Sequence, residues 1–98
     1  MTNERRQELD DIEKCMKTRS GRRLLWRLLE MAGVYRSTFS QDALVMAFQE
    51  GQRNQGLVLL SDIMAVDPDG YILMAKEAKA RQEAKEAERE RQRESESE

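Results

Sequence analysis

The sequence is poor in the residues that most often carry out chemistry. It contains no histidine and a single cysteine, Cys15. The absence of histidine removes the commonest general base, the Ser-His and Cys-His nucleophile pairs, and the commonest metal ligand. A phosphate-binding loop is also missing, because no Lys-Ser or Lys-Thr follows Gly51 or Gly56. We therefore expect a protein that is not an enzyme and that holds no metal and no cofactor.

The single cysteine and the short apolar runs limit the compartment in which the chain works. Cys15 cannot form a disulfide within the chain, which suits a reducing compartment such as the cytoplasm. We expect its side chain to act as a small apolar group on an N-terminal helix, with a reactive thiol or an intermolecular bridge as the alternative. Apolar runs such as Leu57–Leu60 and Tyr71–Ala75 are far too short to span a bilayer, so no membrane partner is expected.

Charge is abundant but balanced. Charged residues make up 37% of the 98 residues, aromatic residues only 5%, and the formal net charge is −2. The net charge is 0 over residues 1–19 and −1 over each of residues 20–75 and 76–98. No segment carries the excess positive charge that drives non-specific DNA binding, so protein is favoured over nucleic acid as the partner.

Helical periodicity predicts an all-α fold with a small three-helix core, a short N-terminal helix and a long charged C-terminal helix. Residues 1–19 form a charged helical extension, residues 20–75 the core domain, and residues 76–98 a charged tail. No strand pattern of alternating polarity is present. A core of about fifty residues is marginal alone, so self-association or docking on a partner is expected.

The first core helix, residues 21–33, is strongly amphipathic. Arg23, Arg27 and Glu30 lie opposite a broad apolar arc, and Arg22 and Trp26 lie at its border. We expect Ser20 to cap its start, and Gly33 to end it in a left-handed conformation with Val34 reaching back to Leu29. The apolar arc consists of Leu24, Leu25, Leu28, Leu29, Met31 and Ala32.

The second core helix is predicted from about residue 41 to residue 66, capped by Thr38 or Ser40. Gly51 and Gly56 interrupt it, and they either allow close approach of a neighbouring helix or mark a break between two shorter helices. We favour one continuous helix because the apolar stripe resumes in phase after the second glycine. The stripe expected to face the core contains Leu44, Phe48, Gly51, Gln55, Val58 and Leu59, widened by Val45, Leu60 and Ile63.

Residues that start or interrupt helices predict the remaining elements of the core. Asp67 as N-cap with Pro68 in the first helical position predicts a third core helix, which brings residues 71–75 onto the core. The connector between the first two core helices is polar except for Tyr35 and Phe39, which we expect to fold under as apolar plugs.

The tail carries segregated charges. Arg81, Lys85, Arg89 and Arg93 form a basic stripe, and Glu86, Glu90, Glu94 and Glu98 form an acidic stripe about 100° away around the helix. One hypothesis is that the tail pairs with a copy of itself or with a partner. The alternative is a solvated helix that frays into a disordered end over residues 95–98.

Candidate binding residues occur on the first core helix and on the tail. An aromatic residue beside arginines can hold a nucleic acid, but Trp26 at the edge of an apolar face is more typical of a packing or protein-interface anchor. The candidate partner-binding residues are Arg22, Arg23, Trp26, Arg27, Arg81, Lys85, Arg89 and Arg93.

Several sequence blocks resemble a family of small tailed-bacteriophage proteins, typified by a Bordetella phage protein. They are Gly21–Glu30, Ala32–Ser37 with Phe39, Ala47–Arg53, Gly56-Leu57 and Tyr71–Ala78, and the resemblance covers about residues 18–78. It implies a phage origin and supplies no catalytic residues.

From this resemblance we expect a non-enzymatic helical module that binds a phage structural protein or itself as a homo-oligomer. It would act in virion assembly or as a virion component, in the host cytoplasm or in the virion. The alternative is an early phage factor that binds and modulates a host protein or nucleic acid.

Overall fold

A computed structural model describes residues 1–97, and this part of the chain contains four helices and no strand. The helices are α1 (Asn3–Met16), α2 (Arg19–Ala32), α3 (Ala43–Val66) and α4 (Pro68–Ser97). The predicted all-α class is confirmed. The described helices include none that is both long and apolar enough to cross a membrane.

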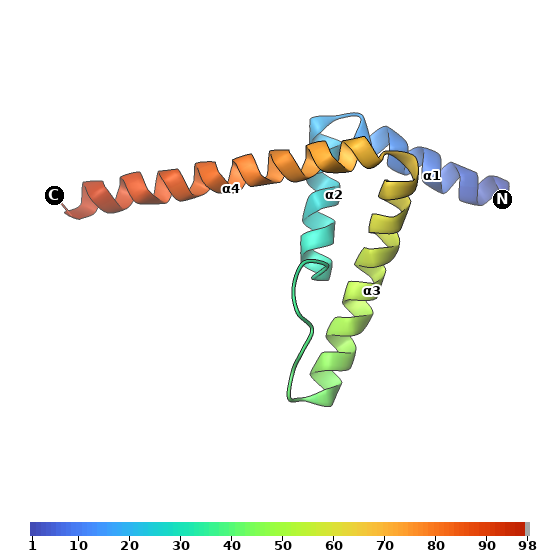
Figure 1. Cartoon of the computed structure of the whole chain (residues 1–98), viewed down its shortest axis with the longest axis horizontal. Helices are drawn as coiled ribbons and strands as arrows, with labels where there is room; N and C mark the ends of the chain where they lie inside the picture. The colour runs from blue at the N-terminus through green and yellow to red at the C-terminus, as the bar shows by residue number, and fades with distance from the viewer. Residues whose placement is uncertain (98) are drawn as a thin grey trace.

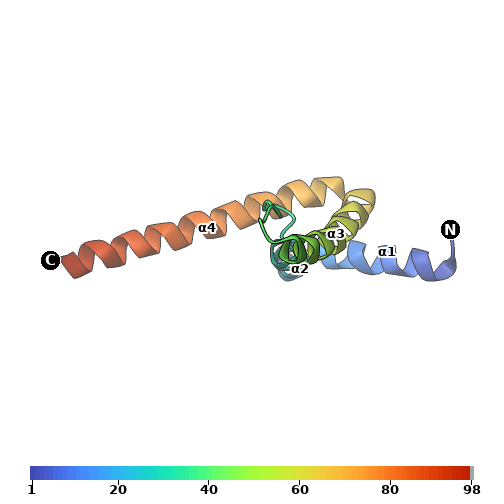
Figure 2. The ribbon, with the colours of Figure 1, turned by 90° about the horizontal axis from the view of Figure 1, so that it is seen from below.

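The molecule is elongated and flat. Helices α2 and α3 lie side by side, while α1 and α4 leave one end of this pair in opposite directions (Figures 1 and 2). The extents are 63 × 39 × 16 Å and the radius of gyration is 17.3 Å. A compact domain of this length has a radius of gyration of about 13 Å. Much of each long helix therefore lies outside the common core.

The predicted N-caps of α2 and α3 are wrong, because other residues cap both helices. Thr18, not Ser20, caps α2, because its extended backbone lets its hydroxyl accept a hydrogen bond from Gly21 N at 3.0 Å. Asp42, not Thr38 or Ser40, caps α3 by accepting from Leu44 N and Val45 N. A carboxylate accepts both bonds and also suits the positive end of the helix.

The predicted end of α2 at Gly33 and the predicted start of α4 at Asp67 are confirmed. Gly33 has φ 80°, its N–H donates to Glu30 O at 3.0 Å, and Val34 N donates to Leu29 O at 3.2 Å. This pair of bonds is the Schellman motif, and the buried Val34 side chain joins Leu29 in the core. Asp67 caps α4 by accepting from Gly70 N at 2.9 Å, directly before Pro68.

The core is small and draws on all four helices. Its buried apolar members are Met16, Leu25, Leu29, Val34, Ile63 and Met74. Met16 belongs to α1, so the core extends beyond the expected residues 20–75, because Ile12 and Cys15 pack on it beside Met16. The predicted leucine face of α2 is buried only in part: Leu24, Leu28 and Met31 are exposed. Likewise, of residues 71–75 on α4, Ile72 and Leu73 are exposed.

Helix α3 is continuous, as predicted, but only part of its predicted face packs on the core. Gly56 lies against α2, where a Cβ would come within 2.6 Å of Ala32 Cβ and 2.5 Å of Val34 Cγ2. The predicted stripe is confirmed only near the end of the helix, where Ile63 is buried and Leu59 and Leu60 pack on the core. Its earlier members are exposed, Leu44 at 83% and Phe48 at 68%.

Helix lengths explain this exposure. The 24 residues of α3 span about 36 Å and the 14 residues of α2 only about 21 Å, so the start of α3 extends past the end of α2. The connector runs alongside this extension, and Phe39 is 78% exposed on it, so this side chain is not the apolar plug that the sequence predicted.

The two glycines of α3 provide a matched pair of substitutions. We expect Gly56→Ala to lower the free energy of unfolding by about 1–3 kcal/mol, because the new methyl overpacks the contact with α2. We expect Gly51→Ala to raise it by about 0.5–1 kcal/mol, since a Cβ there meets nothing within 4 Å. Urea unfolding at low protein concentration measures both; equal effects of the two changes would contradict the packing described here.

Candidate protein-binding groove

An ion pair fixes α4 across α2. Arg22 Nε lies 2.8 Å from Glu77 Oε1, and its Nη2 donates to Glu77 Oε2 at 3.1 Å. Arg22 Nη1 donates to the Met16 carbonyl at the end of α1, at 2.8 Å. Arg19 Nε also donates to Glu77 Oε2, at 3.2 Å. The Arg22 and Glu77 side chains are each only 12% exposed. Three helices are therefore joined at one guanidinium.

This ion pair shifts the ionisation of both partners. The pKa of Glu77 is held below its ordinary value, mainly by the hydrogen bonds from Arg22 and by the positive charge of Arg22. The hydrogen bond and the charge of Arg19 lower it further, and partial burial opposes these effects. The hydrogen bonds with Glu77 raise the pKa of Arg22 above its ordinary value. Arg22 was a candidate partner-binding residue, and the structure places it in a contact within the chain.

Trp26 belongs to an aromatic cluster beside this ion pair. Its ring stacks on Tyr35 with centroids 5.0 Å apart, and it lies 6.4 Å from the Tyr71 ring. The two tyrosine hydroxyls share a hydrogen bond of 2.8 Å. Burial, followed by this hydrogen bond, raises the pKa of Tyr35. The cluster fixes the connector to α4 and leaves Trp26 at the edge of a groove.

The groove between α2 and α4 gathers basic residues that are far apart in the sequence. Arg23 and Arg27 of α2 line it together with Arg81 and Lys85 of α4, and Trp26 is also part of the lining. Its volume is about 430 Å³, and Ser20, Leu24 and Glu30 complete the lining. A second hollow beside it also contains Trp26, Glu30, Arg81 and Lys85, and is extended along α4 by Ala75, Ala78, Lys79 and Gln82. Five of the eight candidate residues thus form one surface.

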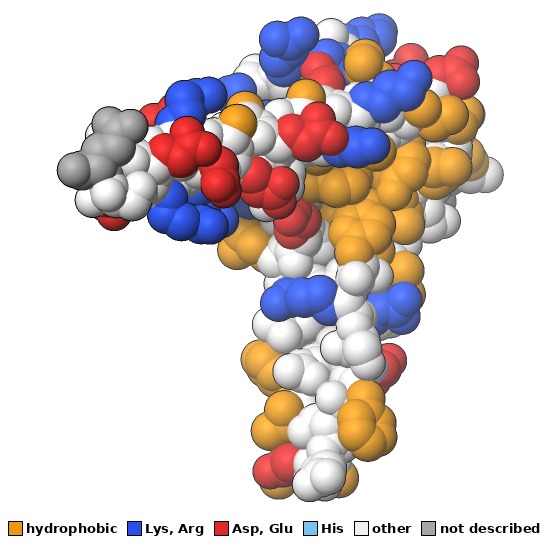
Figure 3. Space-filling model, turned by 60° about the vertical axis from the view of Figure 1, so that its left-hand side comes forward, with side chains coloured by type: hydrophobic (Ala, Val, Ile, Leu, Met, Phe, Trp, Pro, Cys, Tyr) orange, Lys and Arg blue, Asp and Glu red, His pale blue; other side chains and the backbone are white. Residues whose placement is uncertain are grey.

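The other two candidates, Arg89 and Arg93, lie on the free part of α4. Every residue from Gln82 to Ser97 is exposed, and both acidic and basic side chains are seen on this helix (Figure 3). Arg93 lies 3.7 Å from Glu90 within the helix. The helix persists through Ser97, and Glu98 of the predicted acidic stripe lies outside the described residues.

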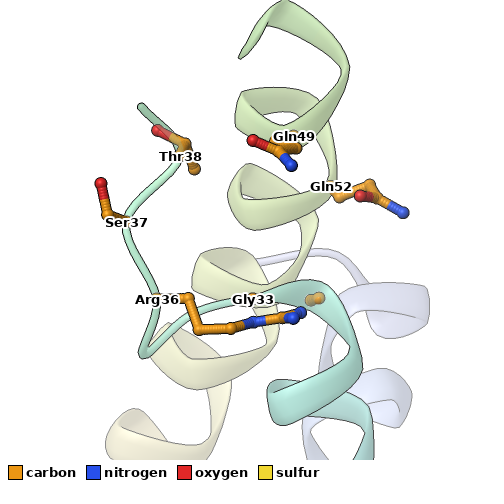
Figure 4. A pocket seen from close by; sticks show the side chains of 7 residues that line it. Gly33, Arg36, Ser37, Thr38, Gln49 and Gln52 are labelled. Carbon is orange, nitrogen blue, oxygen red and sulfur yellow. The ribbon is translucent and has the colours of Figure 1, made fainter. Parts of the chain in front are cut away.

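A polar pocket that the sequence did not predict lies between the connector and α3 (Figure 4). It measures about 180 Å³ and is lined by Ala32, Gly33, Arg36, Ser37, Thr38, Gln49 and Gln52. Arg36 Nη2 donates to Glu30 O at 3.2 Å, and Thr38 contacts Glu50. The hydroxyl groups of Ser37 and Thr38 and the side-chain amides of Gln49 and Gln52 can form hydrogen bonds with a ligand in this pocket. The path of the connector brings them together, and no local sequence signal encodes that path.

The three carboxylates between residues 42 and 62 make contacts within the chain. Asp62 pairs with Arg5 of α1, Asp42 caps α3, and Glu50 accepts from Thr38. Within residues 1–97, no three histidine, cysteine or carboxylate side chains come together as a metal site.

The fold and the groove describe a small all-α protein with a groove rich in basic residues. Residues 12–76 match the model of a family described as Bbp19-like phage protein. The match covers well over half of the chain, so the chain belongs to this phage protein family, and the predicted resemblance is confirmed. No curated protein and no solved structure matches it.

Acid should weaken the fold through Glu77. Because the pKa of Glu77 is lowered in the folded chain, its contribution is complete above the unfolded value of about 4.3 and is lost as the pH falls through the folded value. We expect Glu77→Gln to cost about 1–2 kcal/mol at neutral pH and to flatten the loss of stability below pH about 4.5. Urea unfolding across pH measures this. Glu83→Gln on the exposed helix is the control, and parallel curves for the wild type and Glu77→Gln would refute the assignment.

Proposed function

We propose that this phage protein is a non-enzymatic helical module that binds another phage protein during virion assembly or within the virion. The α2–α4 groove is the proposed contact. The observation that carries the proposal is that Arg23 and Arg27 of α2 and Arg81 and Lys85 of α4 line one groove together with Trp26. Arginine and tryptophan are the residues that most often dominate the energy of protein interfaces.

The occupant that fits this groove is an acidic segment of a partner protein. Four basic side chains attract carboxylates, and the amphipathic indole of Trp26 suits the apolar part of a peptide. Glu30 lies in both hollows of the groove and would repel a continuous run of phosphates. The overall charge of −2 also favours protein over nucleic acid.

The free helix of residues 82–97 supplies a second contact in this proposal. It projects away from the body and is exposed on every side (Figures 1 and 2). Side chains held away from the core are available to a partner helix with the complementary charge pattern. In this proposal the protein has two contact surfaces for partners, the groove and the free helix.

The second candidate function is an early phage factor that binds a host protein or a nucleic acid. The combination of Trp26 with Arg23 and Arg27 favours it, since an aromatic ring beside arginines can stack on a base while the arginines hold phosphates.

Quantitative mass spectrometry of purified virions and of infected-cell extracts separates the two functions. The proposal predicts the protein at a defined copy number per virion, or in assembly intermediates bound to a structural protein. Detection only in extracts, bound to a host factor, would overturn it in favour of the early factor.

A paired charge reversal tests the groove itself. We expect Arg23→Glu with Arg27→Glu to weaken binding to the phage partner at least tenfold, because the groove then repels acidic side chains. Lys14→Glu with Lys17→Glu is the matched control, since Lys14 on α1 and Lys17 directly after α1 are both exposed. Affinities are measured by calorimetry with the partner captured from infected cells. Equal effects of the two pairs would exclude the groove. Steep salt dependence with DNA, lost in the groove variant, would support the early factor.

A further inference from the structure

Helix α1 carries the densest run of acidic residues in the sequence. Four of the six residues from 8 to 13 are acidic and none is basic. Glu8, Asp10 and Asp11 are exposed, and Glu13 is half-buried. Residues three positions apart share one side of a helix, so Glu8 and Asp11 lie on one flank of α1 and Asp10 and Glu13 on another. The part of α1 that points away from the core is therefore acidic on both flanks.

Contacts within the chain leave this acidic surface accessible. Glu8 lies 3.5 Å from Arg5 in the preceding turn, but the two side chains are 57% and 41% exposed. Asp11 accepts a hydrogen bond of 2.9 Å from the side-chain amide of Gln7, which is also exposed. Exposed ion pairs of this kind contribute little free energy. The carboxylates can therefore bind cationic groups outside their own helix.

The groove between α2 and α4 has the opposite charge on two walls. Arg23 and Arg27 lie four residues apart on α2, and Arg81 and Lys85 lie four residues apart on α4. Each pair therefore spans about 6 Å along its helix. Among the residues that line this groove, Glu30 alone is acidic. A helix with acidic side chains on both flanks is electrostatically complementary to two basic walls.

The acidic run and the groove of one chain cannot meet. Ile12 and Met16 pack α1 on the core, and Arg5 pairs with Asp62 of α3. Helices α1 and α4 leave the α2–α3 pair in opposite directions, so α1 points away from the groove of its own chain (Figures 1 and 2). The complementary charges can therefore come together only between two molecules.

The free helix is a poorer occupant of the groove. Its acidic residues Glu86, Glu88 and Glu90 are interleaved with basic ones, and Arg91 pairs with Glu88 on the same helix. Basic side chains on this helix would face the basic walls of the groove. The run at residues 8–13 contains no basic residue, so it is the segment of this chain that the groove attracts most strongly.

We propose that copies of this protein associate head to tail, with the acidic run of α1 in one copy lying along the α2–α4 groove of the next. This inference rests on the proposed function, because it names an occupant of the same groove. The contact joins two different surfaces, so it is heterologous and can be repeated from copy to copy. An acidic segment of a phage partner then competes with α1, so partner binding and self-association exclude each other at the groove.

The charges set the strength of the contact and its dependence on salt. Exposed ion pairs are individually weak and are screened by salt. We expect species heavier than the 11.4 kDa monomer when the protein concentration exceeds a value on the order of 100 µM at low salt. At about 0.5 M salt, where the screening length is about 4 Å, the chain should be monomeric. Sedimentation velocity of the full chain measures both.

Two neutralised variants test the contact in a mixture. The first carries Glu8→Gln, Asp10→Asn and Asp11→Asn, and the second carries Arg23→Gln and Arg27→Gln. Each alone should self-associate at least tenfold more weakly than the wild type, because each lacks one of the two surfaces. Mixed in equal amounts, they should form a 1:1 complex of twice the monomer mass and grow no further, since one intact α1 and one intact groove remain per pair.

The matched control removes three exposed acidic charges from the free helix, through Glu83→Gln, Glu86→Gln and Glu90→Gln. It should self-associate like the wild type. Loss of association in this control, with none in the α1 variant, would assign the contact to the free helix and overturn the proposal. A wild-type chain that stays monomeric at low salt would also overturn it, and so would a mixture of the two variants that stays monomeric.

The failure of this inference and the failure of the proposed function are distinguishable. Sedimentation uses the purified chain alone, so its result does not depend on a phage partner. The α1 variant keeps its groove intact and should bind the phage partner at least as tightly as the wild type in calorimetry. A partner that binds a strictly monomeric chain contradicts the head-to-tail contact only. Self-association without any bound phage partner contradicts the proposed function only.

Discussion

The arrangement of this protein depends on one guanidinium. Arg22 joins the Met16 carbonyl of α1 and the carboxylate of Glu77 on α4, so the direction in which α4 leaves the body is set at this contact. The apolar core alone is small, with six buried side chains, and leaves most of α4 uncovered. The contact between Arg22 and Glu77 orients α4 where the core does not, because a charge-assisted, bidentate pair holds two planar groups in a defined orientation. The basic groove exists because α4 is held across α2 in this way.

The second constraint is the mismatch in length between neighbouring helices. Helix α3 has 24 residues and α2 has 14, so α2 does not reach the first half of α3, and most residues there are exposed. Helix α4 likewise continues for many residues beyond its contact with α2 (Figure 1). The molecule therefore has a charged groove with a free charged helix at one end, and exposed apolar side chains such as Leu44 and Phe48 at the other.

Local rules predicted the helices well and the packing less well. The ends at Gly33 and Asp67 follow from backbone chemistry within a few residues, and both were predictable. The buried face of α3 was predicted at Leu59, Leu60 and Ile63 but not nearer the start of the helix, where the exposed side chains are as apolar as the buried ones. Of the candidate site, the basic and aromatic residues were identified, but their meeting in one groove depends on the crossing of α2 and α4. The role of Arg22 inside the chain also depends on Glu77, 55 residues away.

The most direct test is the distance distribution between α1 and α4 in solution. Spin labels at Asp10 and Gln92, in a Cys15→Ala background, report the direction in which α4 leaves the body; both positions are exposed. We predict one narrow distribution for the otherwise wild-type chain and for Arg91→Gln, which removes an exposed ion pair on the free helix. Arg22→Gln should broaden the distribution, because α4 is then no longer held across α2. A narrow and unshifted distribution for Arg22→Gln would show that the groove does not depend on this contact.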